Sequence, residues 1–84
     1  MYKVKKDTNP NKLAGALAIG LKEEGLINMQ CIGSAAVNQA IKATIIARGF
    51  LAPEGIDIRI VPSFGSTEIE GETKSLINFQ LNKE

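Results

Sequence analysis

Residues 27–50 read INMQCIGSAAVNQAIKATIIARGF, and this stretch decides the fold. Residues 27–32 alternate apolar and polar side chains, which is typical of a strand with one buried face. Gly33 and Ser34 then turn the chain, and Ser34 is a suitable N-cap for a helix predicted over about 35–48. The stretch is therefore a strand followed by a helix, the repeating unit of an α/β fold.

The same signals predict the elements on either side of this unit. Gly49 ends the second helix, and Pro53 prevents it from resuming. Asn9 and Pro10 begin an earlier helix, because asparagine caps free amides and proline suits the first helical position. The remaining predicted boundaries are a helix end at Gly25 and strands over 2–6, 56–62 and 75–82, with possible extensions into 67–69 and 73–74 around a hairpin connection.

The order β-α-β-α-β-β predicts one α/β domain over residues 1–84. Right-handed crossovers that progress in one direction place both helices on one face of a four-stranded mixed sheet, giving two layers. The strand patterns support this one-sided cover, because apolar and polar positions alternate. One face can hold Val4, Met29, Cys31, Ile58, Ile60, Ile77 and Phe79, and the other Lys3, Lys5, Asn28, Gln30, Arg59, Asn78 and Gln80.

The second helix carries more apolar surface than one sheet requires. Its apolar arc spans roughly 200°, about twice that of an ordinary surface helix. The helix is either buried centrally in the monomer or covered by a second subunit, and the small size of the domain favours a dimer. The residues that we assign to this oligomer interface are Ala43, Ile46, Ala47 and Phe50.

Composition places the chain among ordinary globular proteins. Its formal net charge is only +1, so any nucleic-acid surface must come from local clustering of lysines. Cys31 is the only cysteine, which excludes an internal disulfide and fits a reducing cytoplasm. The apolar stretch Leu13–Leu21 is too short to cross a bilayer, so no membrane association is expected.

Catalysis has little support in this sequence. The chain has no histidine, and no serine, cysteine or lysine has an obvious base at a useful spacing. Glu68, Glu70 and Glu72 alternate along an exposed hairpin, which is typical of a solvated edge and a weak metal site. No glycine-rich nucleotide loop is present. We therefore expect no enzyme activity, no metal and no cofactor.

The two predicted helix starts face the same edge of the sheet and are flanked by lysines. Helix N-termini favour anions, phosphates especially. Ser34 and Asn9 can equally serve as caps alone, and the polar helix residues can be an ordinary solvated face. The candidate nucleic-acid-binding residues are Lys5, Lys6, Asn9, Lys12, Gly33, Ser34, Asn38 and Lys42, of which Lys6 and Lys12 are expected to matter most.

The segment Ile32–Phe50 resembles the signature of the stage V sporulation protein S family. Shorter matches support it at Ala14–Ala18, Leu51–Asp57 and Pro62–Phe64. That family is similar in fold to Alba, the archaeal chromatin protein. The resemblance implies an Alba-like fold, a dimer, possible DNA or RNA binding and a role in spore development. It also implies contacts from the first βα loop and the start of the second helix.

One part of the Alba pattern does not carry over. The basic β-hairpin arm of Alba-like proteins corresponds here to a hairpin with three glutamates, which a phosphate backbone would repel. The leading hypothesis is a dimeric sporulation regulator that binds DNA or RNA, and the acidic hairpin favours weaker or single-stranded binding over Alba-like gripping of duplex DNA. The alternatives are a protein-interaction module in spore development and, less favoured, a binder of small phosphorylated ligands.

Overall fold

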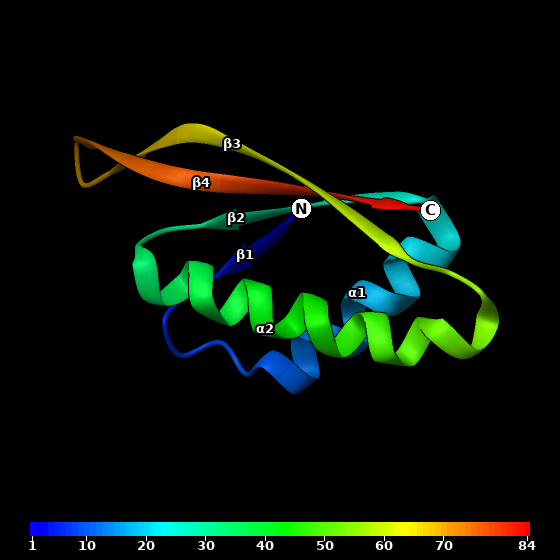
Figure 1. The fold of residues 1–84 in the computed structure, drawn as a ribbon. Coiled ribbons are helices and arrows are strands. Elements are labelled where there is room, and N and C mark those ends of the chain that lie inside the picture. The colour runs from blue at the N-terminus through cyan, green and yellow to red at the C-terminus, as the bar shows by residue number, and fades with distance from the viewer.

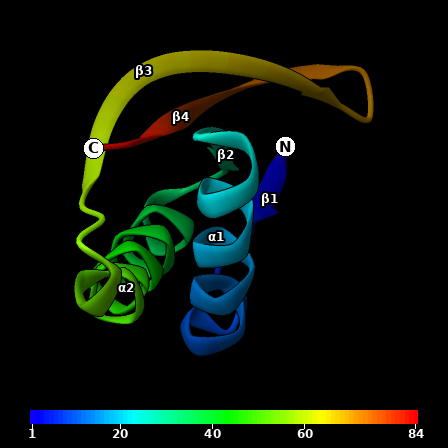
Figure 2. The same ribbon diagram turned by 90° about the vertical axis from the view of Figure 1, so that its right-hand side faces the viewer.

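The computed structural model describes residues 1–84 and confirms the predicted β-α-β-α-β-β order. The elements are β1 (Tyr2–Val4), α1 (Pro10–Glu24), β2 (Leu26–Cys31), α2 (Ser34–Leu51), a short 3₁₀ helix (Ala52–Glu54), β3 (Ile58–Ile69) and β4 (Glu72–Lys83). The strands form one sheet in the order β1-β2-β4-β3. β1 pairs with β2 in parallel and the other pairs are antiparallel, so the sheet is mixed. Both helices lie under one face of it (Figures 1 and 2).

Strand register confirms the predicted division between a covered and an open sheet face, except at Lys5, which lies in the loop after β1 because this strand ends at Val4 and not at residue 6. Met29 lies between Tyr2 and Phe79, and Cys31 between Val4 and Ile77, so these side chains all point toward the helices. Gln30 lies between Lys3 and Asn78 on the opposite face. Burial of the first set in a single apolar core is the main source of stability for a domain this small.

α1 forms where its sequence signals predict it. The Asn9 side chain accepts hydrogen bonds from the backbone N–H groups of Asn11 and Lys12, and Pro10 occupies the first helical position. Gly25 closes the helix in the left-handed conformation, with φ of 78°, and donates its N–H to the carbonyl of Leu21. Both ends are thus satisfied by local groups, which fixes the length of α1.

α2 differs from its prediction at both ends. Gly33, with φ of 91°, is the N-cap, and no side chain caps the helix, so the prediction that Ser34 caps it is wrong. The helix also passes through Gly49 and ends at Leu51. A glycine inside a helix costs only about 1 kcal/mol, and burial of Leu51 in the core supplies more than that. Pro53 lies in the following 3₁₀ helix.

The buried side of α2 is built from small residues. Ala36, Ala40, Ala43 and Ala47 are completely buried and belong to the same core cluster as Leu17 and Leu21 of α1. Alanines let a helix approach its neighbours closely. Because the side chains of Ala43 and Ala47 are packed inside their own chain, they are not accessible to a second subunit, contrary to what the sequence suggested.

An ion pair joins the end of α2 to the start of β3. Nε of Arg48 lies 2.7 Å from Oδ1 of Asp57, and the same carboxylate accepts the N–H of Ile58. The hydrogen bond from Arg48, and then that from Ile58, hold the pKa of Asp57 below its ordinary value. Both side chains are exposed, so the stabilisation is small.

The lowered pKa of Asp57 makes a testable prediction about pH. A carboxyl whose pKa is lowered in the folded state adds stability above its unfolded pKa and loses it as the pH falls through the folded value. The difference in urea midpoint between the wild type and Asp57→Asn is therefore expected to be largest near neutrality and to shrink from about pH 5 to about pH 2. A difference that does not change with pH would contradict this assignment.

The β3–β4 hairpin extends past the body of the domain as an arm (Figure 1). Pairing continues without a break to Ile69 and Glu72, so the turn consists of Glu70 and Gly71 alone. Both turn residues have positive φ, 51° and 78°, which is typical of a type I′ turn. The arm contributes to the longest dimension of the molecule, 45 Å against 21 and 16 Å, and it carries the three glutamates away from the helix starts.

Candidate nucleic-acid interface

The loop between β1 and α1 is folded back on itself and attached to α2. Thr8 donates its N–H to the carbonyl of Lys5 at 3.1 Å, and its hydroxyl accepts the N–H of Lys5 at 2.8 Å. The Gln39 side chain of α2 donates to the Thr8 carbonyl at 2.8 Å. These three hydrogen bonds fix the backbone that carries Lys5 and Lys6 beside the first turns of α2.

A shallow depression lies where this loop meets the start of α2. It has a volume of about 470 Å³ and is lined by Lys5, Lys6, Ile32, Gly33, Ser34 and Ala35. The first N–H groups of a helix have no partner within the helix, and at α2 no side-chain cap takes their place. Two lysines and the positive end of a helix dipole therefore share one exposed site, a combination that favours an anion.

The structure brings together only half of the predicted binding residues. Lys5, Lys6, Gly33 and Ser34 line this depression, whereas Asn9, Lys12, Asn38 and Lys42 are exposed outside it. Asn38 and Lys42 continue along α2, one and two turns after Ser34. Lys12 lies in the first turn of α1, where Asn9 already serves two amides.

Because Asn9 caps α1, replacing its side chain is expected to lower the stability of the fold. Replacing an asparagine N-cap by alanine costs typically about 1 kcal/mol, so Asn9→Ala should lower the melting temperature by roughly 4–8 °C. Asn11→Ala is the control, because its side chain makes no hydrogen bond in the structure. Equal melting temperatures for the two variants, measured by circular dichroism, would show that the cap is not formed.

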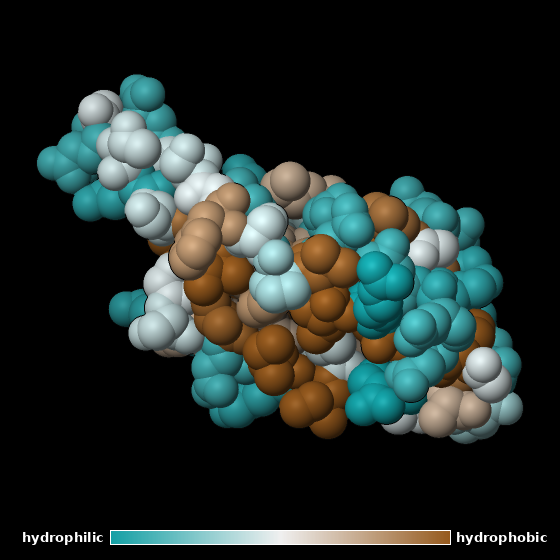
Figure 3. Space-filling view, turned by 45° about the horizontal axis from the view of Figure 1, so that its top comes forward, coloured by the Kyte–Doolittle hydropathy of each residue, from teal (hydrophilic) through white to brown (hydrophobic).

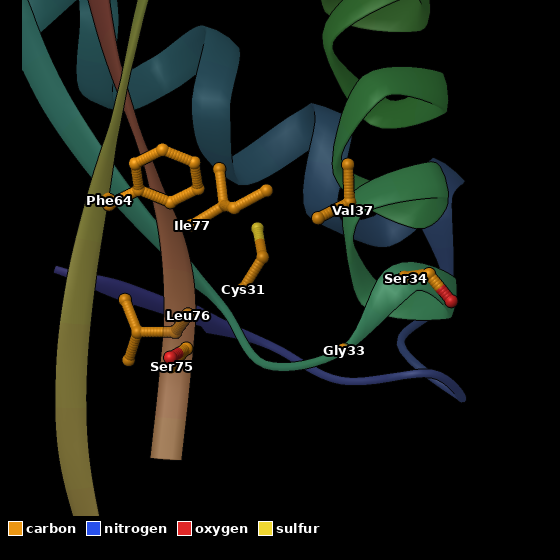
Figure 4. A pocket seen from close by; sticks show the side chains of 8 residues that line it. All are labelled: Cys31, Gly33, Ser34, Val37, Phe64, Ser75, Leu76 and Ile77. Atoms are coloured by element: carbon orange, nitrogen blue, oxygen red, sulfur yellow. The ribbon is translucent and has the colours of Figure 1, made fainter. Parts of the chain in front are cut away.

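An apolar groove adjoins the cationic depression, and sequence reasoning missed it. The groove, of about 290 Å³, is bounded by the start of α2, the end of β2 and the root of the hairpin arm, and it shares Gly33 and Ser34 with the depression. Figure 4 shows Phe64 and Ile77 side by side on the hairpin, with Val37 across the groove on α2. The site therefore combines an apolar half and a cationic half.

The three phenylalanines differ in exposure. Phe79 is buried in the core, whereas Phe64 is 90% exposed and Phe50 is 53% exposed. Phe64 follows the apolar alternation of Ile58 and Ile60 on the helix-facing side of β3. Alternation predicted its face correctly, but the helices do not extend far enough along the arm to cover it.

Cys31 also lines the groove but has no reactive character. Its side chain is buried among core residues, and burial raises the pKa of the thiol to about 11. The thiol is therefore protonated at neutral pH, and a protonated thiol is neither a nucleophile nor a metal ligand. No group of three or more histidine, cysteine, aspartate or glutamate residues could hold a metal ion.

A second exposed feature is an apolar face along the outer flank of α2 and the adjoining part of β3. Ile45 is 62% exposed, Ile41 is half-buried one turn before it, and Ile60 and Pro62 lie on the helix-facing side of β3. Figure 3 shows apolar side chains gathered between the body and the root of the arm. On a helical wheel this flank is opposite to the one that carries Ile46 and Phe50.

Comparison with known families finds a match that covers the whole chain. The profile of a family described as Stage V sporulation protein S matches residues 1–84. The chain belongs to the stage V sporulation protein S family. That description names no catalytic activity.

A solved structure extends the comparison to the fold. Alba from Thermoplasma volcanium superimposes with a TM-score of 0.63, covers 98% of each chain and has 10% sequence identity. At this identity the match establishes the Alba-like fold and nothing about ligands. No helix of this family member is both long and apolar enough to cross a membrane.

Proposed function

We propose that this member of the stage V sporulation protein S family is a non-enzymatic sporulation regulator that binds nucleic acid through the cationic depression. The observation that carries the proposal is the placement of Lys5 and Lys6 beside the uncapped start of α2. Two flexible ammonium groups and free backbone amides suit phosphate oxygens, and they read charge rather than sequence. Asn38 and Lys42 continue the track along α2, and Lys12 extends it at α1.

The modest net charge of +1 implies that the affinity of one protomer is weak. A homodimer would present two such depressions to one strand and so raise the affinity without new contacts within a protomer. We propose that the exposed flank of α2 with Ile41 and Ile45 forms the interface. Phe50 and Ile46, which the sequence favoured, belong to the opposite flank and provide the alternative interface. Nucleic acid as the ligand would place the protein in the cytoplasm, where Cys31 remains reduced.

A titration with three labelled ligands tests the proposal. Duplex DNA, single-stranded DNA and a structured RNA of similar length are each titrated with the protein at several salt concentrations. Binding to at least one, falling as salt rises, is expected. If none binds near physiological salt, the proposal fails.

The acidic arm makes its own prediction for the same assay. Replacing Glu68, Glu70 and Glu72 together by glutamine should raise affinity by roughly two- to fivefold at low salt, because three repulsive charges are removed. The gain should vanish near physiological salt, where the Debye length is about 8 Å. The melting temperature should change little, since these side chains are exposed. A gain that persists at high salt would mean that the arm touches the ligand.

A protein-interaction module is the second candidate function. The exposed apolar face of α2 and β3 favours it, because contiguous apolar surface marks association sites. The affinity of docking through that face should be unchanged or even raised when salt is added, whereas the affinity for phosphates falls. Salt dependence therefore separates the two candidates.

A further inference from the structure

Phe64 is the most exposed large apolar residue of the chain. Its side chain is 90% exposed, although a phenylalanine gains roughly 1.5–3 kcal/mol when it is buried. It lies opposite Ile77 in the register of β3 and β4. The ring adds almost nothing to the core. Stability of the fold therefore does not explain why a phenylalanine occupies this exposed position.

The surroundings of the ring indicate what it can contact. Phe64 lines the groove of about 290 Å³ and a second depression of about 270 Å³ with Pro62 and Ser63. The groove continues into the cationic depression through the shared residues Gly33 and Ser34. An aromatic ring is thus placed next to a site suited to phosphate, with an apolar floor between them.

The glutamates of the arm are distant from this site, and the carboxylate nearest to it in sequence is that of Asp7, which follows Lys6. The first glutamate of the arm, Glu68, follows Phe64 by four residues of extended strand, which is about 13 Å. That separation exceeds the Debye length of about 8 Å at physiological salt. Lys5 and Lys6 outnumber Asp7 on one side of the ring, and no glutamate of the arm lies within a Debye length along the strand on the other. The charge near the ring is therefore complementary to a polyanion.

We propose that Phe64 stacks on a base, and that the ligand of this site is single-stranded nucleic acid whose adjoining phosphates bind at Lys5 and Lys6. This inference rests on the proposed function and narrows its ligand. A base can stack on a protein aromatic ring only when it has left its own helix, so duplex DNA does not satisfy the site. The ring tolerates any base, because every base has an apolar face.

The chain contains no tryptophan, which makes a direct test possible. Phe64→Trp introduces the single tryptophan of the chain at the site, and its emission is distinct from that of Tyr2. An oligothymidylate of about 12 nucleotides covers one binding site of this kind. Stacking should quench the tryptophan fluorescence as the oligonucleotide is added. Phe50→Trp is the matched control on the far end of α2, and its fluorescence should not change.

Affinity provides the second readout. Phe64→Ala should weaken oligothymidylate binding by about 5- to 150-fold, the range found when a stacking residue is removed, while Phe64→Tyr should keep the wild-type affinity. Phe64→Ala is expected to melt like the wild type because the ring is exposed. Unchanged single-strand affinity in Phe64→Ala, with binding by the wild type intact, overturns the stacking role and leaves the proposed function standing.

Three further outcomes are decisive. If the wild type binds no nucleic acid, the proposed function fails and the stacking role fails with it. If Phe64→Ala sediments as a monomer where the wild type is a dimer, Phe64 belongs to the subunit interface and the stacking role is overturned. A loss of duplex affinity in Phe64→Ala as large as its loss of single-strand affinity also contradicts the stacking role.

Discussion

Replacing Lys5 and Lys6 together by alanine is expected to lower the affinity for nucleic acid by about 10- to 100-fold at low salt. Both side chains line the depression at the start of α2, so the double variant removes its mobile charges and leaves only the backbone amides. The loss should be similar for every sequence tested, because lysine–phosphate contacts do not read bases. Fluorescence anisotropy with labelled oligonucleotides measures it.

Two single variants show whether the position of the charge matters. Lys3 lies beside Gln30 on the open face of the sheet, away from the depression, so Lys3→Ala should weaken binding much less. Lys12→Ala should have an intermediate effect, because Lys12 is exposed near the start of α1 but outside the depression. If Lys3→Ala lowers the affinity as much as Lys6→Ala does, the open sheet face with Arg59 is the binding surface instead.

Placing a carboxylate at the centre of the proposed subunit interface is expected to convert a dimer to monomers. Ile45 is 62% exposed in the single chain, so Ile45→Glu should leave the fold intact. Burying an unpaired charge costs several kcal/mol, which corresponds to a loss of dimer affinity of more than about 100-fold. Analytical ultracentrifugation over a range of protein concentrations measures this loss.

Phe50→Glu is the matched control for Ile45→Glu. It places the same charge on the opposite flank of α2, at a side chain of similar exposure, 53%. Dissociation by Phe50→Glu and not by Ile45→Glu would return the interface to the flank that the sequence favoured. If the wild type sediments as a monomer at high concentration, the proposed dimer does not form.

The fold could be predicted from sequence because local and periodic signals agreed at most positions. Asn9, Pro10 and Gly25 set the ends of α1 through hydrogen bonds within a few residues, and alternation along the strands assigned each side chain to a face. Such signals act over short distances and need no tertiary knowledge. Extension of β3 and β4 toward the turn also followed from the pattern.

The end of α2 and its buried side depended on packing that the sequence does not display. Gly49 does not end the helix, because Leu51 is held in the core two residues later. The apolar arc of α2 correctly indicated surplus hydrophobic surface, but not which part of it the monomer covers. Alanines proved to face the core, and larger side chains such as Ile45 proved to face solvent.

Half of the candidate site was predictable and half was not. Lys5, Lys6, Gly33 and Ser34 could be grouped, because both helices begin at the same edge of the sheet. Phe64 could not, because its exposure depends on how far α2 extends beneath the hairpin arm. Strand alternation identifies the face of a side chain and not whether another element covers that part of the face.

The salt dependence of single-strand binding tests the central claim most directly. The logarithm of the association constant, measured for the wild type and for the Lys5→Ala/Lys6→Ala double variant, is plotted against the logarithm of salt concentration. The wild type should give a straight line of negative slope, and the variant a slope shallower by about two units, one for each lost phosphate contact. A wild-type affinity that does not change with salt, or two parallel lines, would contradict a phosphate site at Lys5 and Lys6.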